Sequence, residues 1–107
     1  MTVTTQIRTY TVRPERLDEW VAKWRTLVVP LRRQFGFDVH GSWVDRERSE
    51  HIWVVSYGGT GSFEEANARY WASAQREALC LDPSQFLLAE HLRQVEAVQC
   101  GRCRMAE

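Results

Sequence analysis

The sequence predicts an α+β fold: a ferredoxin-like βαββαβ sandwich whose four-stranded antiparallel sheet carries two helices on one face. The hydrophobic period changes from about two to the helical value after Pro14, and again after Ser62. A period close to two, typical of strands, recurs in four segments: 4–12, 37–45, 51–57 and 92–99. This order, within 107 residues, predicts a single domain over residues 1–107.

The first strand and the first helix follow from residue type and spacing. Residues 4–12 are rich in Thr, Ile, Tyr and Val, which favour strands, and Pro14 ends the segment. Apolar residues then recur at spacings of three and four as far as Gly36, which is expected to stop a long amphipathic helix. Because Pro30 removes the hydrogen bond to the Thr26 carbonyl, we expect a kink or a short break there.

The next two strands are predicted to form a hairpin around the charged turn 46–50. With a regular turn, residues whose numbers sum to about 96 lie opposite each other, so Trp43 would face Trp53. The odd-numbered residues of both strands would then share one face of the sheet.

The second half of the chain begins with the glycine-rich loop 58–61, which lacks the spacing of a phosphate-binding loop. Ser62 and Glu65 form a capping-box pattern that starts the second helix. Residues 82–90 predict a short helix, and residues 92–99 the last strand. The buried stripe of the second helix is expected to comprise Phe63, Ala66, Tyr70, Trp71, Ala74 and Ala78.

Composition excludes several classes of partner. Fourteen basic and fourteen acidic residues cancel, so we expect no nucleic acid and no membrane as partner. The polar start, residues 1–6, lacks the features of a signal peptide, and the expected location is cytoplasmic. Cys80, Cys100 and Cys103 are expected to be reduced, and the last two form a CxxC without a second ligand pair for zinc.

The segment 51–57 places His51, Trp53 and Tyr57 on one side of its strand. We predict that this is the face that the helices leave uncovered. Because so much aromatic surface is rarely left in water, a homodimer packed sheet to sheet is expected, with a ligand cavity between the sheets. Five further residues are expected on the same face: Arg8, Tyr10, Val39, Trp43 and Val55.

Site roles follow from side-chain chemistry. A histidine ordinarily titrates near neutrality, so His51 is expected to be the first candidate for proton transfer. Tyr57 could donate a hydrogen bond to a carbonyl or phenolate, while Arg8, with Tyr10 beside it, could hold a carboxylate or enolate. The expected substrate-binding residues are Trp43, Trp53, Val55 and Val39.

Two alternatives remain open for these residues. The side chains could simply fill a dimer core, since interfaces are often rich in aromatic residues. A slip of one residue would also exchange the two faces of the sheet, and His40 or His91 could then displace His51. Three histidines without a well-placed carboxylate do not form a metal triad, so we expect no metal and no cofactor.

Several short motifs follow one another along the chain: Ile7-Arg-Thr-Tyr-Thr-Val-Arg-Pro14, Val28-Val-Pro-Leu31, Gly36-Phe37 with Gly41-Ser-Trp43, and His51-Ile-Trp53 followed by Tyr57. Their order and spacing resemble the NIPSNAP family, within the dimeric α/β-barrel superfamily. The resemblance implies a dimeric α/β barrel whose two sheets enclose a ligand cavity. Related barrels include cofactor-independent monooxygenases, polyketide cyclases, muconolactone isomerases, aldoxime dehydratases and haem-degrading enzymes, so the fold does not select one reaction.

The leading functional expectation is an enzyme, with a biosynthetic role, acting on a hydrophobic or aromatic, polyketide-like molecule. Its acid/base groups would catalyse cyclisation, isomerisation or cofactor-independent oxidation. One alternative is a ligand-binding or interaction protein without chemistry. Another is a haem-binding or haem-degrading protein with a histidine ligand.

Overall fold

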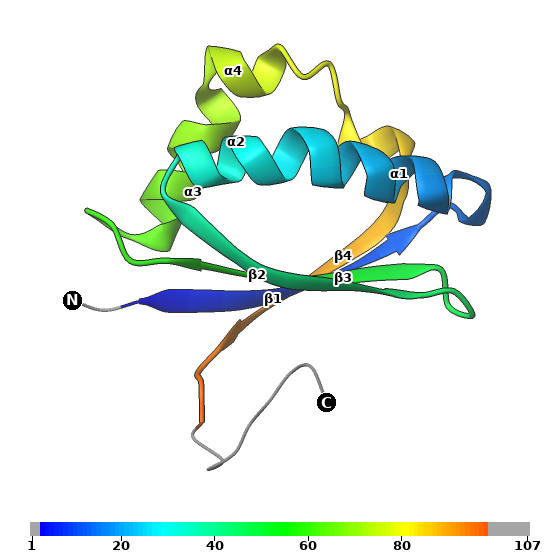
Figure 1. Cartoon of the computed structure of the whole chain (residues 1–107), viewed down its shortest axis with the longest axis horizontal. Helices are drawn as coiled ribbons and strands as arrows, with labels where there is room; N and C mark the ends of the chain where they lie inside the picture. Colours follow the sequence, from blue (N-terminus) through cyan, green and yellow to red (C-terminus); the bar gives the residue numbers. More distant parts are fainter. Residues whose placement is uncertain (1–2, 99–107) are drawn as a thin grey trace.

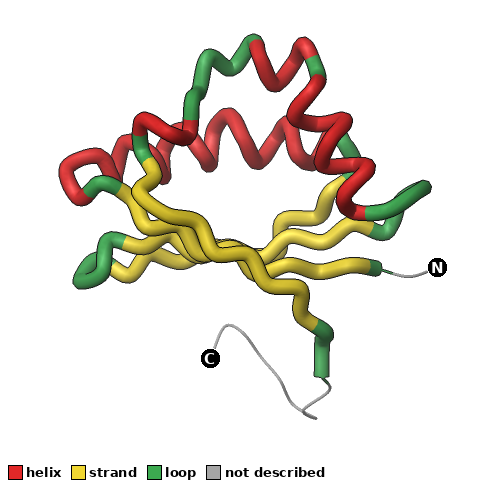
Figure 2. Tube along the Cα trace, turned by 180° about the vertical axis from the view of Figure 1, so that it is seen from behind, coloured by secondary structure: helices red, strands yellow, loops and turns green. Residues whose placement is uncertain are grey.

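A four-stranded antiparallel sheet in the order β2-β3-β1-β4 carries all the helices of the described chain on one face (Figures 1 and 2). The structure is a computed structural model that describes residues 3–98. The strands are β1 (Thr4–Val12), β2 (Phe37–Asp45), β3 (Glu50–Tyr57) and β4 (Leu87–Val95). This arrangement confirms the ferredoxin-like α+β fold that the sequence predicts.

The first helical segment runs without a break through one 3-10 turn, two α-helical stretches and a π turn between them. These are η1 (Pro14–Arg16), α1 (Leu17–Lys23), η2 (Trp24–Val28) and α2 (Val29–Gln34). Pro30 has no N–H for the Thr26 carbonyl, and the N–H of Val29 donates instead to the Trp24 carbonyl, five residues back. The expected irregularity is confirmed as a widened turn, and Gly36 ends the helix with a φ of 89°.

The second helical segment is shorter than the sequence predicts. Helix α3 (Phe63–Ala72) begins with the predicted capping box of Ser62 and Glu65. It stops at Ser73, whose extended backbone and side chain then cap α4 (Ala74–Glu77). The break changes the buried face, so the predicted stripe is correct for Phe63, Ala66 and Tyr70 but wrong for Trp71, Ala74 and Ala78, which are exposed.

The last strand begins earlier than predicted. The expected helix over residues 82–90 is one 3-10 turn, η3 (Pro83–Gln85), which the Asp82 side chain caps. Pairing with β1 begins at Leu87 and brings Glu90 opposite Tyr10. The predicted strand 92–99 is therefore displaced, and its last residue lies outside the described residues.

The hairpin register also differs from the prediction. A bulge at His40 lets Val39 pair with Val55 and Gly41 with Val54. Between the turn and the bulge the ladder is regular, and Trp43 pairs with Ile52 rather than with Trp53. The expected register was wrong because β3 begins at Glu50, one residue earlier than predicted, and because the bulge shifts the pairing by one further residue beyond Gly41.

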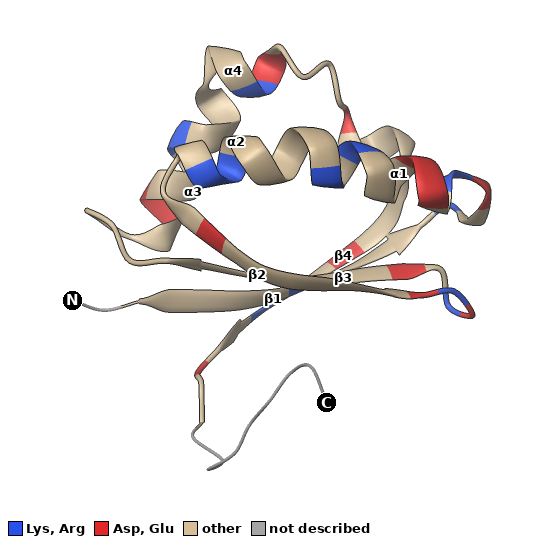
Figure 3. Ribbon diagram, viewed as in Figure 1, with Lys and Arg blue, Asp and Glu red and all other residues tan. Residues whose placement is uncertain are grey.

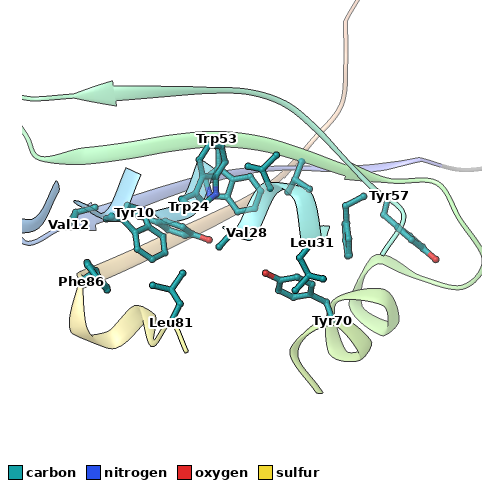
Figure 4. Packing of buried hydrophobic residues seen from close by; sticks show 14 of the residues in the cluster. Tyr10, Val12, Trp24, Val28, Leu31, Trp53, Tyr57, Tyr70, Leu81 and Phe86 are labelled. Atoms are coloured by element: carbon teal, nitrogen blue, oxygen red, sulfur yellow. The ribbon is translucent and has the colours of Figure 1, made fainter. Parts of the chain in front are cut away.

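The sheet face expected to be open is the one that the helices cover. Figure 4 shows Tyr10, Trp53 and Tyr57 pointing into the core beneath the helices. The predicted alternation is correct, but these residues were expected on the open face and lie on the covered one. The reason is that the apolar row of the first helix packs on the most aromatic face of the sheet. The misplaced residues are Arg8, Tyr10, Val39, His51, Trp53, Val55 and Tyr57.

Trp43 does lie on the open face, as expected, and is 45% exposed. It pairs with Ile52, which lies on this face, whereas the bulge at His40 returns Val39 to the covered face opposite Val55. Its neighbours on this face include Ile7, Ile52 and Val54.

Charges are interspersed along the helices and the β2–β3 turn rather than gathered by sign (Figure 3). Over residues 3–98, none of the helices is long and apolar enough to cross a membrane. Cys80 is free and exposed, whereas Cys100 and Cys103 fall outside the described residues.

Candidate functional site

A pocket lies between the covered face of the sheet and the helices. Its free volume is about 50 Å³, which accommodates a small polar group or a few water molecules. The lining residues come from both layers: Tyr10, Trp20, Trp24, Val28, Arg32, Trp53, Tyr70, Trp71, Arg76, Pro83, Leu87 and Glu90.

The first helix supplies one row of this lining. Trp20, Trp24, Val28 and Arg32 follow at intervals of four, and all four are buried. An interval of four keeps side chains on one face of a helix, and the π turn that Pro30 induces lies within the row.

Edge-to-face aromatic contacts form the walls. The ring centroids of Trp24 and Trp53 lie 5.2 Å apart at 67°, and those of Tyr10 and Trp53 lie 6.2 Å apart at 70°. Figure 4 shows these rings grouped beside Val28, between strand and helix. Such walls suit a flat, apolar group.

Two arginines of the pocket are almost fully buried. Arg32 is 1% exposed, its guanidinium carbon lies 4.0 Å from the Tyr70 ring centroid, and its Nη1 donates to Oδ1 of Asn67 at 2.8 Å. Arg76 is 5% exposed and donates from Nη1 to the Leu81 carbonyl at 3.0 Å. Burial, together with the nearby charge of Arg8, lowers the pKa of Arg32 to about 10, so this side chain still carries its charge near neutral pH.

Five buried donors that belong to pocket residues have no hydrogen-bond partner among the described residues. Burial raises the pKa of Tyr70, so its hydroxyl stays protonated and able to donate. An unsatisfied buried donor is costly, and such groups in a native structure call for an explanation. The atoms are Nε of Arg32, Nε of Arg76, the hydroxyl of Tyr70, and Nε1 of Trp24 and of Trp53.

His51 lies behind the pocket wall and is fully buried. Trp20 donates from Nε1 to His51 Nδ1 at 3.1 Å, and His51 Nε2 lies 3.2 Å from the Ser42 hydroxyl. Because an indole only donates, Nδ1 accepts and Nε2 carries the proton. Burial lowers the pKa of His51 to about 4, so the ring is neutral and serves to hold Trp20 in place.

Two other predicted site residues lie outside the pocket lining. Tyr57 donates from its hydroxyl to the Thr60 carbonyl at 2.8 Å and accepts from Arg69 at 3.2 Å, which fastens the glycine-rich loop. Arg8 donates to Gln6 at 3.1 Å and to the Tyr10 hydroxyl at 3.3 Å, and its guanidinium carbon lies 5.6 Å from the centroid of the Trp53 ring, so it flanks two lining residues.

Of the residues selected from the sequence, the pocket brings together Tyr10 and Trp53. Its lining does not include the other six: Arg8, Val39, Trp43, His51, Val55 and Tyr57.

Sequence reasoning missed four polar residues of the pocket: Arg32, Tyr70 as a donor, Arg76 and Glu90. For Arg32 a signal existed, because it follows Val28 by four residues and so continues the apolar row of the helix. Glu90 was predicted to end a short helix, so its pairing with Tyr10 in the sheet was not predicted.

A metal site is not evident in residues 3–98, where no group of three or more His, Cys, Asp or Glu side chains is placed to hold an ion. The remaining described histidines are exposed: His40, whose Nε2 lies 2.7 Å from the Ser56 hydroxyl, and His91.

The NIPSNAP family is found by comparison of both sequence and structure. The sequence profile of the NIPSNAP family matches residues 5–95. A NIPSNAP family protein from Agrobacterium tumefaciens superposes with a TM-score of 0.79 at 14% identity, over 96% of this chain and 100% of that one. An uncharacterized NIPSNAP domain protein from Burkholderia xenovorans gives a TM-score of 0.74 at 14% identity, over 96% and 99%.

A further similar structure has a different name. The protein from Bacteroides thetaiotaomicron named "Putative antibiotic biosynthesis monooxygenase" gives a TM-score of 0.70 at 17% identity, over 96% of each chain. Identities this low show likeness of fold alone. Comparison with curated protein sequences gave no match.

The buried, neutral His51 predicts a pH-dependent stability. The pKa is 6.5 for an ordinary histidine and about 4 in the fold, so between these values the unfolded chain takes up a proton that the folded chain does not. The stability is therefore complete above pH 6.5 and falls as the pH drops towards 4, by about 2 kcal/mol between pH 7 and pH 5.

Urea unfolding at the two pH values checks this, with His51→Gln expected to remove that loss. His91→Gln, at an exposed position, is the control and should keep it. An equal loss in native protein and His51→Gln would contradict the assignment.

Proposed function

This chain belongs to the NIPSNAP family, and we propose that it binds an aromatic or otherwise hydrophobic small molecule between its sheet and its helices and catalyses proton transfer on it. The observation that carries the proposal is the pocket itself, in which aromatic walls surround polar groups that have no partner. An apolar lining with a few convergent polar groups is typical of small-molecule sites, although the free volume of about 50 Å³ is smaller than in pockets that enclose a whole ligand.

Glu90 is the proposed base. It is the carboxylate among the lining residues, it is exposed, and it lies opposite Tyr10 across β1 and β4. A carboxylate at this point can remove an acidic C–H proton, while buried donors stabilise the enolate oxygen that forms. Proton removal of this kind would begin a cyclisation, an isomerisation or a cofactor-independent oxidation.

The likeness to the Bacteroides thetaiotaomicron protein supports the oxidation only by analogy of fold. Two of the residues selected from the sequence keep a role in this proposal: Tyr10 beside Glu90, and Trp53 as a wall. Arg8 and His51 become positioning residues, which hold Tyr10 and Trp20 respectively.

Binding without chemistry is the second candidate function. It uses the same aromatic walls and unpartnered donors but needs no base, and the carboxylate among the lining residues, Glu90, is exposed. With about 50 Å³ of free volume, either function requires side chains such as the half-exposed Trp71 to move before a whole aromatic ring can enter. Haem binding has less support, since none of the lining residues of this pocket is a histidine and both ring nitrogens of His51 are engaged.

Solvent exchange of a carbon acid tests the catalytic proposal. In D2O, the protein should accelerate loss of the benzylic protons of phenylacetone, followed by proton NMR. Glu90→Gln should lower the catalysed rate by about 100-fold, because the base is lost. Glu96→Gln changes an exposed carboxylate just beyond β4 and should leave the rate unaltered.

Saturation-transfer NMR on the same sample reports whether phenylacetone binds. Binding with no acceleration of exchange would contradict catalysis and favour the non-catalytic candidate. Exchange that Glu90→Gln leaves unchanged would remove Glu90 from the proposal.

A second copy of this chain is the proposed partner for the open face of the sheet. Helices cover most of the aromatic surface from which a dimer was expected, but the exposed Trp43 shares the open face with the apolar Ile7, Ile52 and Val54. Sheet-to-sheet packing would bury these side chains, as the family resemblance implies.

Sedimentation velocity at about 10 µM protein, where moderate-affinity dimers persist, tests whether the chain forms a dimer. The native chain should sediment as a dimer and Trp43→Arg as a monomer. Trp71 has the same exposure, 45%, but lies on the helical layer, so Trp71→Arg should remain dimeric. A monomeric native chain would contradict the proposal.

A further inference from the structure

The inner part of the pocket holds buried positive charge that nothing in the described chain neutralises. We propose that Arg32, Arg76 and the Tyr70 hydroxyl bind the carboxylate group of an aromatic acid. This inference rests on the proposed function, because it names the class of ligand that the same pocket takes.

Neither Arg32 nor Arg76 has an acidic partner among the described residues. The ion pairs within residues 3–98 involve other arginines, all at the surface. Glu90, the acidic residue of the lining, pairs with neither Arg32 nor Arg76. A buried guanidinium without a counter-charge is costly, and an anion in the pocket would supply one.

Stacking offsets only part of this cost. The guanidinium carbons of Arg32 and Arg76 lie 4.0 and 5.9 Å from the centroid of the same ring, that of Tyr70, and Arg76 also lies 4.3 Å from Trp71. A cation over an aromatic face is stabilised, but the in-plane N–H groups of its guanidinium still need acceptors. The two charges therefore converge on one ring with their hydrogen-bonding capacity incomplete.

The buried donors that lack a hydrogen-bond partner determine the kind of ligand that fits. Arg32 and Arg76 each use Nη1 on an acceptor of the chain, Asn67 and Leu81, while each Nε–H is left without a partner. The Tyr70 hydroxyl, which Arg76 approaches, has no acceptor for its own proton, and the indole N–H groups of Trp24 and Trp53 add two more donors. A group that only accepts hydrogen bonds matches this set, and a carboxylate accepts about four.

The aromatic walls of the pocket favour a carboxylate attached to a ring over an inorganic phosphate. About 50 Å³ of free volume takes the planar carboxylate group, and the ring needs side chains such as the half-exposed Trp71 to move aside. The edge-to-face pair of Trp24 and Trp53 offers an apolar surface to the ring that carries the carboxylate.

Benzoate and benzamide are the probes, because they share a shape and differ in charge. Titrations of the full chain followed by the indole N–H signals in 15N–1H NMR spectra report both affinity and place. Benzoate should shift the signals of Trp24 and Trp53, leave that of Trp43 unchanged, and bind at least about tenfold more tightly than benzamide.

Variants identify the residues responsible. Arg32→Met and Arg76→Met should each weaken benzoate about tenfold and change benzamide less than about twofold, since only the charged ligand loses a partner. Arg33→Met, an exposed neighbour on the same helix, should change neither. If a variant does not fold, comparing benzoate with benzamide on the native chain still tests whether the pocket recognises the carboxylate.

Equal affinities for benzoate and benzamide would overturn the carboxylate site while leaving the pocket of the proposed function in place. Inorganic phosphate that displaces benzoate with equal affinity would overturn the choice of a carboxylate. No shift of the Trp24 and Trp53 signals with either probe would overturn both this inference and the aromatic-binding pocket.

Discussion

The packing of Trp20 and Trp24 on the covered face of β3 is the contact on which the rest of the structure depends. Trp20 donates to the buried His51, and the Trp24 ring lies 4.5 Å from His51 and 5.2 Å from Trp53. These contacts decide which face of the sheet the helix covers. They also build the wall of the pocket, so the core and the candidate site are made by the same residues.

The pocket departs from what an apolar core would contain. Buried Arg32 and Arg76 lack a carboxylate partner among the described residues, and several neighbouring donors are unsatisfied. Natural sequences break such local rules mainly at functional sites, where the cost is offset when a ligand binds. The distribution of unsatisfied polar atoms, rather than any single reactive residue, therefore locates the site.

Much of the fold could be predicted from local sequence, because strand period, helix caps and proline effects act over a few residues. Residues 4–12 and 37–45, the Ser62 cap and the irregularity before Pro30 are examples. The sequence could not show which face of the sheet the helices cover, because period-two alternation defines two faces without distinguishing them. The bulge at His40 likewise depends on pairing with β3.

A crystal structure of the protein with 4-bromobenzoate would show directly whether the ligand site lies inside one chain, between the sheet and the helices. Anomalous scattering from bromine gives the position of the ring without ambiguity. We expect a bromine peak beside Trp24 and Trp53, with the carboxylate near Arg32 and Arg76. A bromine peak on the open face beside Trp43, with the pocket unfilled, would contradict this expectation.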